Sequence, residues 1–244
     1  MKKILFMAII VLIIASVIAS LGNNPESILT NMGKPKGSSG IKRLHYKVYL
    51  FGVLPVGTAV LGDNGVGSYK GASARHLSAI AQSSEAISRI YPFQAALDAY
   101  LDTKTLLPLF FSQRLTSAGK EIIKEVSYDQ KNGIMEKAGV RRNIEPNTYE
   151  PLSLLLKIRS MDLSKEGSFD FNINNNQKNY AFQGAVAKGR KFFTLKAKIF
   201  RRDKNQYHRS EVTFVLSPDL ENAPVLIKVF ASGAFLTARL TGIE

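Results

Sequence analysis

The chain has 244 residues, of which 33 are Lys or Arg and 19 are Asp or Glu, giving a formal net charge of +14. It contains no Cys, no Trp and only three His. These counts exclude disulfide frameworks, thiolate metal sites, cysteine nucleophiles and haem attached through Cys. The hydrophobic share of 45% is typical of a globular domain with one sizeable core and argues against an intrinsically disordered chain.

The first 20 residues have the pattern of a secretory signal. Two lysines precede an apolar run that begins at Ile4, and small residues lie before candidate cleavage points after Ala19 and Ser20. We therefore expect an exported, periplasmic protein, and the absence of Cys excludes a lipoprotein anchor. Because Ile4–Leu21 is also long enough to span a bilayer, the alternative is an uncleaved inner-membrane anchor that leaves the chain facing the periplasm.

A flexible linker and one β-rich domain are expected to follow. Residues 21–41 are rich in Gly, Asn, Pro and Ser and have no apolar period, which is typical of a linker. Over residues 42–244, apolar and polar side chains alternate in short runs, which predicts half-buried strands. The runs are Leu44–Leu50, Ala74–Ala81, Phe93–Leu101, Leu107–Thr116, Ile122–Tyr128, Phe169–Ile173, Tyr180–Val186, Phe192–Phe200, Val212–Leu216, Val225–Phe230 and Phe235–Leu240.

Turn signals separate many of these runs, for example at Asp102–Thr105 and at Asn132-Gly133. Parallel strands would need helical crossovers, which the sequence does not provide. The pattern therefore predicts a mostly β, single-domain protein of about ten antiparallel strands in a strongly curved or rolled sheet.

Two segments have helical spacing instead. The main one is Thr148–Met161, with Thr148 as the expected cap and Pro151 in the first turn. A shorter helical turn is expected over Ser84–Tyr91, ended by Pro92. The apolar side chains of the main helix cover much of its circumference, so we expect it to cover or plug the concave side of the sheet. These side chains are Leu152, Leu155, Leu156 and Ile158.

Several longer motifs extend across the β-rich region. They are Leu44–Tyr49 with Gly52 and Gly57, Tyr100–Pro108, Gln113-Arg114, Glu125–Gln130, Glu150–Ser153 with Leu155 and Arg159, Val215–Asp219, Ala223–Val225 and Gly233–Thr241. Together they resemble the exported bacterial family of unknown function DUF3108, over nearly everything from Leu44 onward. The resemblance implies an exported protein with a β-rich fold similar to the curved sheets of periplasmic lipoprotein carriers. It supplies no activity and no catalytic residue.

Motifs for catalysis or metal binding are weak. The three histidines, His45, His76 and His208, lie in predicted strands, without ligand spacing and without a Gly-x-Ser-x-Gly elbow. Gly62–Gly67 is glycine-rich but precedes no helix, so we expect a hairpin loop rather than a phosphate site. Asp162–Asp170 has the spacing of a calcium loop, but its twelfth position is Ile, which favours a helix-exit turn. We expect no catalytic residue, metal or cofactor.

Positive charge is concentrated in one region. From Lys188 to Arg209 there are nine basic residues and one acidic residue. Alternation places Lys196, Lys198 and Arg202, with Phe192 and Phe200, on the face away from the core. The basic candidates for binding an anionic surface are Lys188, Arg190, Lys191, Lys196, Lys198, Arg201 and Arg202.

An exported protein does not meet nucleic acid. The expected anionic partners are therefore phospholipid headgroups, lipopolysaccharide phosphates or acidic envelope polymers. A solvated basic face without a specific partner is the alternative.

Three classes of function remain. The favoured one is a non-enzymatic envelope protein that binds an apolar or lipid-like ligand in its concave sheet, against Leu152, Leu155, Leu156 and Ile158. It is favoured because strands such as Val225–Phe230 and Leu106–Phe111 have apolar residues on both faces. The second is a structural or interaction protein that docks on anionic surfaces through the basic strand pair. A hydrolase is least expected, since it would need His76 or His208 in a pocket beside a carboxylate and a hydroxyl.

Overall fold

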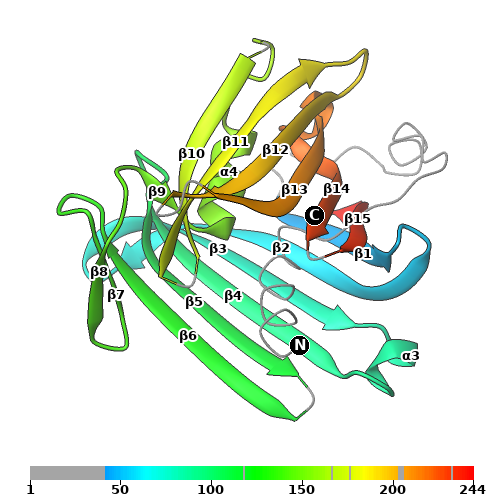
Figure 1. Ribbon diagram of the computed structural model, residues 1–244, viewed down its shortest axis with the longest axis horizontal. Helices are drawn as coiled ribbons and strands as arrows, with labels where there is room; N and C mark the ends of the chain where they lie inside the picture. Colours follow the sequence, from blue (N-terminus) through cyan, green and yellow to red (C-terminus); the bar gives the residue numbers. More distant parts are fainter. Residues whose placement is uncertain (1–41, 118, 166, 176, 203–205, 232) are drawn as a thin grey trace.

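The computed structural model describes residues 42–117, 119–165, 167–175, 177–202, 206–231 and 233–244. The expected signal or anchor (1–20) and the expected linker (21–41) lie outside these residues. The described residues form fifteen strands, two α-helices and one 3-10 helix (Figure 1).

The strands and helices follow one another along the chain. They are β1 (Arg43–Leu50), β2 (Leu54–Tyr69), β3 (Ala72–Ser83), α3 (Glu85–Ser88), β4 (Phe93–Asp102), β5 (Pro108–Ser117), β6 (Lys120–Asp129), β7 (Ile134–Lys137), β8 (Val140–Asn143), β9 (Thr148–Tyr149), α4 (Pro151–Arg159), β10 (Gly167–Asn175), β11 (Lys178–Lys188), β12 (Phe193–Arg201), β13 (Gln206–Ser217), η2 (Pro218–Leu220), β14 (Ala223–Ala231) and β15 (Ala234–Ile243).

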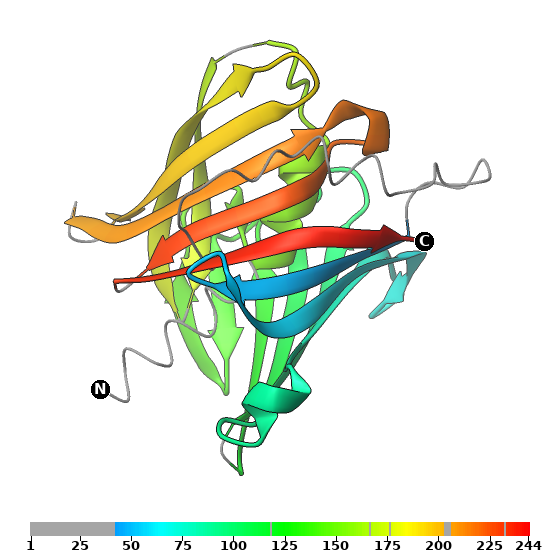
Figure 2. The same cartoon turned by 90° about the vertical axis from the view of Figure 1, so that its right-hand side faces the viewer.

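All of these strands belong to one sheet. Its order is β8-β7-β6-β5-β4-β3-β2-β1-β15-β14-β13-β12-β11-β10-β9. Neighbouring strands pair antiparallel, apart from β9 and β10, which pair in parallel. The chain thus forms two meanders, and β15 returns to pair with β1 between them. The sheet curves around α4 but does not close, because β8 and β9 are its two edges (Figures 1 and 2).

The expected mostly β class is confirmed, but the expected number of about ten strands is too low. The strands form one open sheet rather than the strongly rolled one expected, and they are not all antiparallel, because α4 provides the helical crossover between the parallel β9 and β10. Strands β7, β8 and β9 have four, four and two residues, too short to show a period in the sequence. Strand β2 was missed because Gly62–Gly67 has the composition of a loop. It lies within β2 instead, where Asn64 and Gly65 form a bulge opposite His76. Gly65 has φ +83°, a conformation that glycine adopts without strain.

Helix α4 begins two residues later than the sequence suggests. Thr148 is part of β9, and Glu150 is the cap. The Glu150 carboxylate accepts hydrogen bonds from the backbone N–H groups of Leu152 (2.8 Å) and Ser153 (2.6 Å). The Ser153 hydroxyl in turn accepts one from the Glu150 N–H (2.9 Å), which completes a capping box with the roles of its two residues exchanged. Pro151 occupies the first turn, as expected.

The inner face of the sheet packs around α4. Leu152, Leu154, Leu155 and Ile158 are buried and belong to one hydrophobic core, which includes residues from both meanders. Helix α4 lies closest to β3 and β4. Figure 2 shows it enclosed by the curve of the sheet. The expected position of the main helix is therefore correct.

Two other local predictions can be compared with the structure. The tight turn at Asp102–Thr105 is present, since the Asp102 carboxylate accepts the backbone N–H groups of Lys104 (3.0 Å) and Thr105 (2.7 Å). These hydrogen bonds lower the pKa of Asp102. Phe192, in contrast, is buried with the core and does not share the outer face of the lysines.

Candidate functional site

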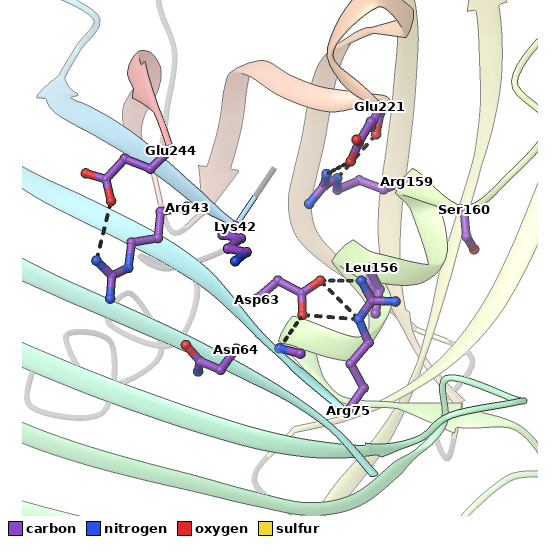
Figure 3. Close-up of a pocket in the computed structure, with 11 residues that line it drawn as sticks. Lys42, Arg43, Asp63, Asn64, Arg75, Leu156, Arg159, Ser160, Glu221 and Glu244 are labelled. Atoms are coloured by element: carbon purple, nitrogen blue, oxygen red, sulfur yellow. Dashed lines mark hydrogen bonds and ion pairs between the residues drawn. The ribbon is translucent and has the colours of Figure 1, made fainter. Parts of the chain in front are cut away.

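A pocket of about 780 Å³ opens at the C-terminal end of α4 (Figure 3). Its walls come from the start of β1, the end of β15, the bulge of β2, strand β3, the end of α4 and the turn after η2. Segments far apart in the sequence therefore meet here. Most of the side chains that line the pocket are charged.

The bulge of β2 fixes the first ion pair of the pocket. Arg75 Nε donates to both carboxylate oxygens of Asp63, at 3.2 and 3.0 Å, and Arg75 Nη2 also contacts this carboxylate. Hydrogen bonding to Asp63 raises the pKa of Arg75. The same carboxylate accepts the Gly65 N–H (3.1 Å), which ties the bulge to the ion pair.

The second ion pair lies at the end of α4. The Arg159 side chain is only 14% exposed, and its Nη2 lies 3.7 Å from Glu221 Oε2. Burial is the main cause that lowers its pKa, and the charge of Glu221 acts in the opposite direction. Asn222 Nδ2 donates to the Arg159 carbonyl oxygen (3.0 Å). The turn after η2 therefore holds the C-terminal end of α4, where the Arg159 cation lies near the carbonyl end of the helix dipole.

The rim of the pocket joins the two ends of the described chain. Glu244 accepts from Arg43 Nη1 (3.4 Å) and lies 2.9 Å from His45 Nε2. The Lys42 N–H donates to the Glu244 carbonyl oxygen (2.7 Å). The pocket is therefore lined by four cationic and three anionic side chains. These are Lys42, Arg43, Arg75 and Arg159, and Asp63, Glu221 and Glu244.

Leu156 from α4 is the one large apolar side chain among the residues that line the pocket. Beside it, a cavity of about 30 Å³ reaches toward the core and is lined by Leu156, Leu152 and Leu155 of α4. Three of the four leucine and isoleucine residues predicted to contact a ligand therefore face these two spaces. The fourth, Ile158, is fully buried in the core.

The predicted basic residues are spread along the sheet rather than gathered in one site. Lys196 and Lys198 are exposed on the outer face of β12, and Lys198 Nζ lies 3.8 Å from Glu211. Arg202 contacts Asp170 (2.7 Å) and Asn172 (3.0 Å) near one end of β12. Arg201 lies at that same end, whereas Lys188, Arg190 and Lys191 lie in and beside the β11–β12 turn at the other.

A buried pair of titratable residues was missed. Glu150 is fully buried, and desolvation raises its pKa to about 7, against the lowering effect of its backbone hydrogen bonds and of Lys124. Lys124, on the inner face of β6, is also buried, and desolvation lowers its pKa to about 8. Its ammonium lies 5.6 Å from the centre of the Phe111 ring. The sequence did contain a signal: Lys124 alternates with Val126 and Tyr128, which places all three side chains on the inner face of β6.

His76 does have a carboxylate partner, on the outer face of the sheet. Its Nε2 lies 2.8 Å from Asp98 Oδ1, and its ring stacks on Tyr100 with centroids 4.6 Å apart. Asn64 Nδ2 lies 3.3 Å from His76 Nδ1 and donates to Ser78 Oγ (3.0 Å). Among the described hydrogen bonds, the Ser78 hydroxyl is therefore linked to Asn64 and not to the imidazole of His76. The side chain of His208 lies outside the described residues.

Two features are absent from the part of the chain that the structure describes. Within it, no group of three or more His, Asp or Glu side chains is arranged to hold a metal ion. The carboxylate of Asp162 accepts from the N–H (3.2 Å) and the hydroxyl (2.5 Å) of Ser164, as in a helix-exit turn. Within the same residues, no helix is long and apolar enough to cross a membrane.

Comparison with known proteins identifies the family. The model of the family described as "Protein of unknown function (DUF3108)" matches residues 45–241. The chain belongs to the DUF3108 family. The resemblance found in the sequence motifs is thereby confirmed. No curated protein matches this DUF3108 chain.

Two solved structures are similar to the DUF3108 chain. One is a β-barrel-like protein of the domain of unknown function DUF1849 from Brucella abortus, with a TM-score of 0.61 and 9% identity. The match covers 85% of this chain and 99% of that one. The other is a DUF1089 family protein from Pseudomonas aeruginosa, with a TM-score of 0.45 and 9% identity over 72% of this chain and 90% of that one. The first likeness shows that this chain shares its overall fold with that DUF1849 protein.

Proposed function

We propose that this protein is an exported, non-enzymatic component of the cell envelope that binds an apolar or lipid-like ligand on the concave side of its sheet. The observation that carries the proposal is the pocket at the C-terminal end of α4, which is lined by charged side chains and by the apolar side chain of Leu156. Its volume of about 780 Å³ lies within the range of roughly 300–1,000 Å³ that ligand sites occupy. The expected similarity of the family to periplasmic lipoprotein carriers points the same way.

The chemistry of the pocket favours an amphiphile. Lys42, Arg43, Arg75 and Arg159 outnumber the three carboxylates, so a phosphate or carboxylate headgroup would find cationic partners at the rim. Leu156 provides apolar contact below them. The adjoining cavity of about 30 Å³ holds roughly one water molecule. A long acyl chain would therefore need α4 to move, whereas the headgroup and first methylenes fit the open pocket.

The substitution Leu156→Asp tests this proposal. We expect it to weaken binding of a lysophosphatidylglycerol, titrated calorimetrically below its micelle concentration, by at least about tenfold, or about 1.4 kcal/mol. The physical reason is that a carboxylate in place of Leu156 repels an anionic headgroup and removes the apolar contact.

A matched control is Ile123→Asp, because Ile123 is exposed on the outer face of β6. It should bind the lysolipid as the wild type does. Native mass spectrometry of protein isolated from envelopes should also show a retained amphiphile in the wild type. Equal affinity of the two variants, or no affinity in the wild type, would contradict the proposal.

A second candidate function is docking on an anionic envelope surface through β11 and β12. It is favoured by the exposed Lys196 and Lys198 on the outer face of β12. Because such binding is electrostatic, co-sedimentation with anionic vesicles should fall steeply as salt rises from 50 to 300 mM. The double substitution of Lys196 and Lys198 by Gln should weaken it, and binding indifferent to salt would exclude it.

A further inference from the structure

Two hairpin tips with apolar side chains lie side by side at one end of the sheet. The β1–β2 tip exposes Phe51, Val53 and Leu54 by 49%, 74% and 49% of their surfaces. Its Phe51 N–H donates to the carbonyl oxygen of Phe235 (2.7 Å), which joins it to the β14–β15 hairpin (Figure 2). There the rings of Phe230 and Phe235 pack with centroids 5.1 Å apart. Exposed apolar patches of this kind mark interaction sites.

Cationic side chains follow these tips along β1 and β15, on the outer face of the sheet. Arg239 lies over the ring of Tyr49, 4.4 Å from its centroid, and its Nη2 donates to the Gly52 carbonyl oxygen (2.7 Å). This hydrogen bond ties the cation to the β1–β2 tip. Lys47 is opposite Arg239 in the β1–β15 pairing and is exposed.

Cross-strand pairing places further lysines of β14 and β12 on the same outer face. Thr237 of β15 is opposite Lys228 of β14, Lys228 is opposite Thr213, and Thr213 is opposite Lys196. In the next row, Phe235 is opposite Phe230, Phe230 is opposite Glu211, and Glu211 is opposite Lys198. The tips and the cations therefore form one surface, the docking face. It consists of Phe51, Val53, Leu54, Phe230 and Phe235 with Lys47, Lys196, Lys198, Lys228 and Arg239, and Glu211 is the acidic residue in these rows.

We infer that the docking face binds the surface of a bilayer that contains anionic phospholipid. Phe51, Val53 and Leu54 enter the headgroup region, and the cations behind them bind lipid phosphates. Apolar side chains at the leading edge and lysine or arginine behind it are the combination that interfacial binding requires. The inference rests on the second candidate function and extends it. A soluble acidic polymer would use the cations alone, whereas a bilayer also accepts the apolar tips.

The partner follows from this combination of groups. Charge alone does not separate a membrane from a polyanion, because both offer phosphate or carboxylate groups. The exposed tip residues make the difference, since water-exposed Phe, Val and Leu gain from transfer into the headgroup and acyl boundary. The pocket at the end of α4 lies by the first residue of β1, whereas the β1–β2 tip follows the last residue of β1. Docking at the tips therefore leaves the pocket mouth away from the bilayer.

The test measures co-sedimentation of the chain that remains after removal of the expected signal (residues 21–244) with vesicles of phosphatidylcholine and phosphatidylglycerol at 3:1. We expect Val53→Asp to lower the partition coefficient at least about tenfold, because it places a charge in the inserting tip. Val66→Asp is the matched control: Val66 is 66% exposed in β2, beyond the bulge and away from the tips. This variant should stay within about twofold of the wild type.

A third variant separates the two parts of the surface. Substituting Lys47 and Lys228 by Gln should weaken vesicle binding most at low salt and let it approach that of the wild type as salt rises, which flattens the salt dependence. Poly-glutamate should compete with vesicles for the cations, and Val53→Asp should leave poly-glutamate binding unchanged. Equal vesicle binding by Val53→Asp and Val66→Asp would overturn the inference while leaving the second candidate function in place. No binding of the wild type to these vesicles would overturn both. Neither result bears on lysolipid binding at the pocket.

Discussion

Replacing Glu150 by Gln should remove a loss of stability that the wild-type protein shows as the pH rises from about 4.5 to 7. Burial raises the pKa of Glu150 in the folded protein from 4.5 to about 7, so the folded state binds this proton more tightly than the unfolded state does. The stabilisation is complete below pH 4.5 and is lost as the pH passes through 7. A shift of this size corresponds to roughly 3 kcal/mol of unfolding free energy.

Gln is a suitable replacement because its amide oxygen can still accept one of the backbone N–H groups of Leu152 and Ser153. The measurement is urea unfolding at pH 4.5, 5.5, 6.5 and 7.5 for the wild type and for Glu150→Gln. Glu136→Gln serves as the control, since Glu136 is partly exposed and paired with Arg141 on the surface. It should keep the wild-type pH slope. A Glu150→Gln protein with the same slope as the wild type would contradict a buried carboxyl at this position.

Lys124 acts in the opposite pH range. Burial lowers its pKa to about 8, so the folded state favours the neutral amine. Its contribution to stability is present above the ordinary lysine pKa of 10.5 and is lost as the pH falls through 8. With Glu150, this places a minimum of stability between about pH 7 and 8. The two groups thus predict a minimum in the dependence of the unfolding free energy on pH, which the same urea series extended to pH 10.5 would measure.

The sequence predicted those elements whose side chains alternate over many residues. Strands β4, β5 and β12 are examples, and in β12 the predicted outward positions of Lys196 and Lys198 are correct, since both side chains are exposed. The alternation of apolar and polar residues does not reveal a strand that contains a bulge or one that is too short for the pattern to repeat. The bulge at Asn64 and Gly65 shifts the register of β2 between Asp63 and Val66 and gives its middle the composition of a loop.

The candidate pocket was hidden for a different reason. Asp63, Arg159, Glu221 and Glu244 are widely separated in sequence, and they meet only because β15 pairs with β1 and α4 ends beside η2. Motifs of a few consecutive residues do not predict which distant residues lie together in the folded protein. Leu156 was nominated because helical periodicity is local. Arg159 appeared only as part of a family motif, although a cation at the end of an apolar helix is itself a signal that it needs a partner.

The packed interior restricts where a ligand can bind. The four predicted residues of α4 have different surroundings. Ile158 packs into the core, Leu152 and Leu155 line only the small cavity beside the pocket, and Leu156 also lines the pocket itself. Leu156 is therefore the predicted position that the open pocket makes available to a ligand. Mutation can separate the role of Ile158 in the core from that of Leu156 in the pocket.

The substitution Ile158→Ala should destabilise the protein by about 2–5 kcal/mol, because Ile158 is fully buried and the cavity left behind is surrounded by packed side chains. Leu156→Ala should cost only about 1 kcal/mol, since Leu156 is partly exposed and its removal enlarges an existing pocket. Urea unfolding at pH 6 measures both values, and lysolipid titration beside it should show weakened binding for Leu156→Ala alone. If Ile158→Ala cost less than about 1 kcal/mol and changed ligand affinity, α4 would act as a movable lid over the ligand and not as the plug of the core.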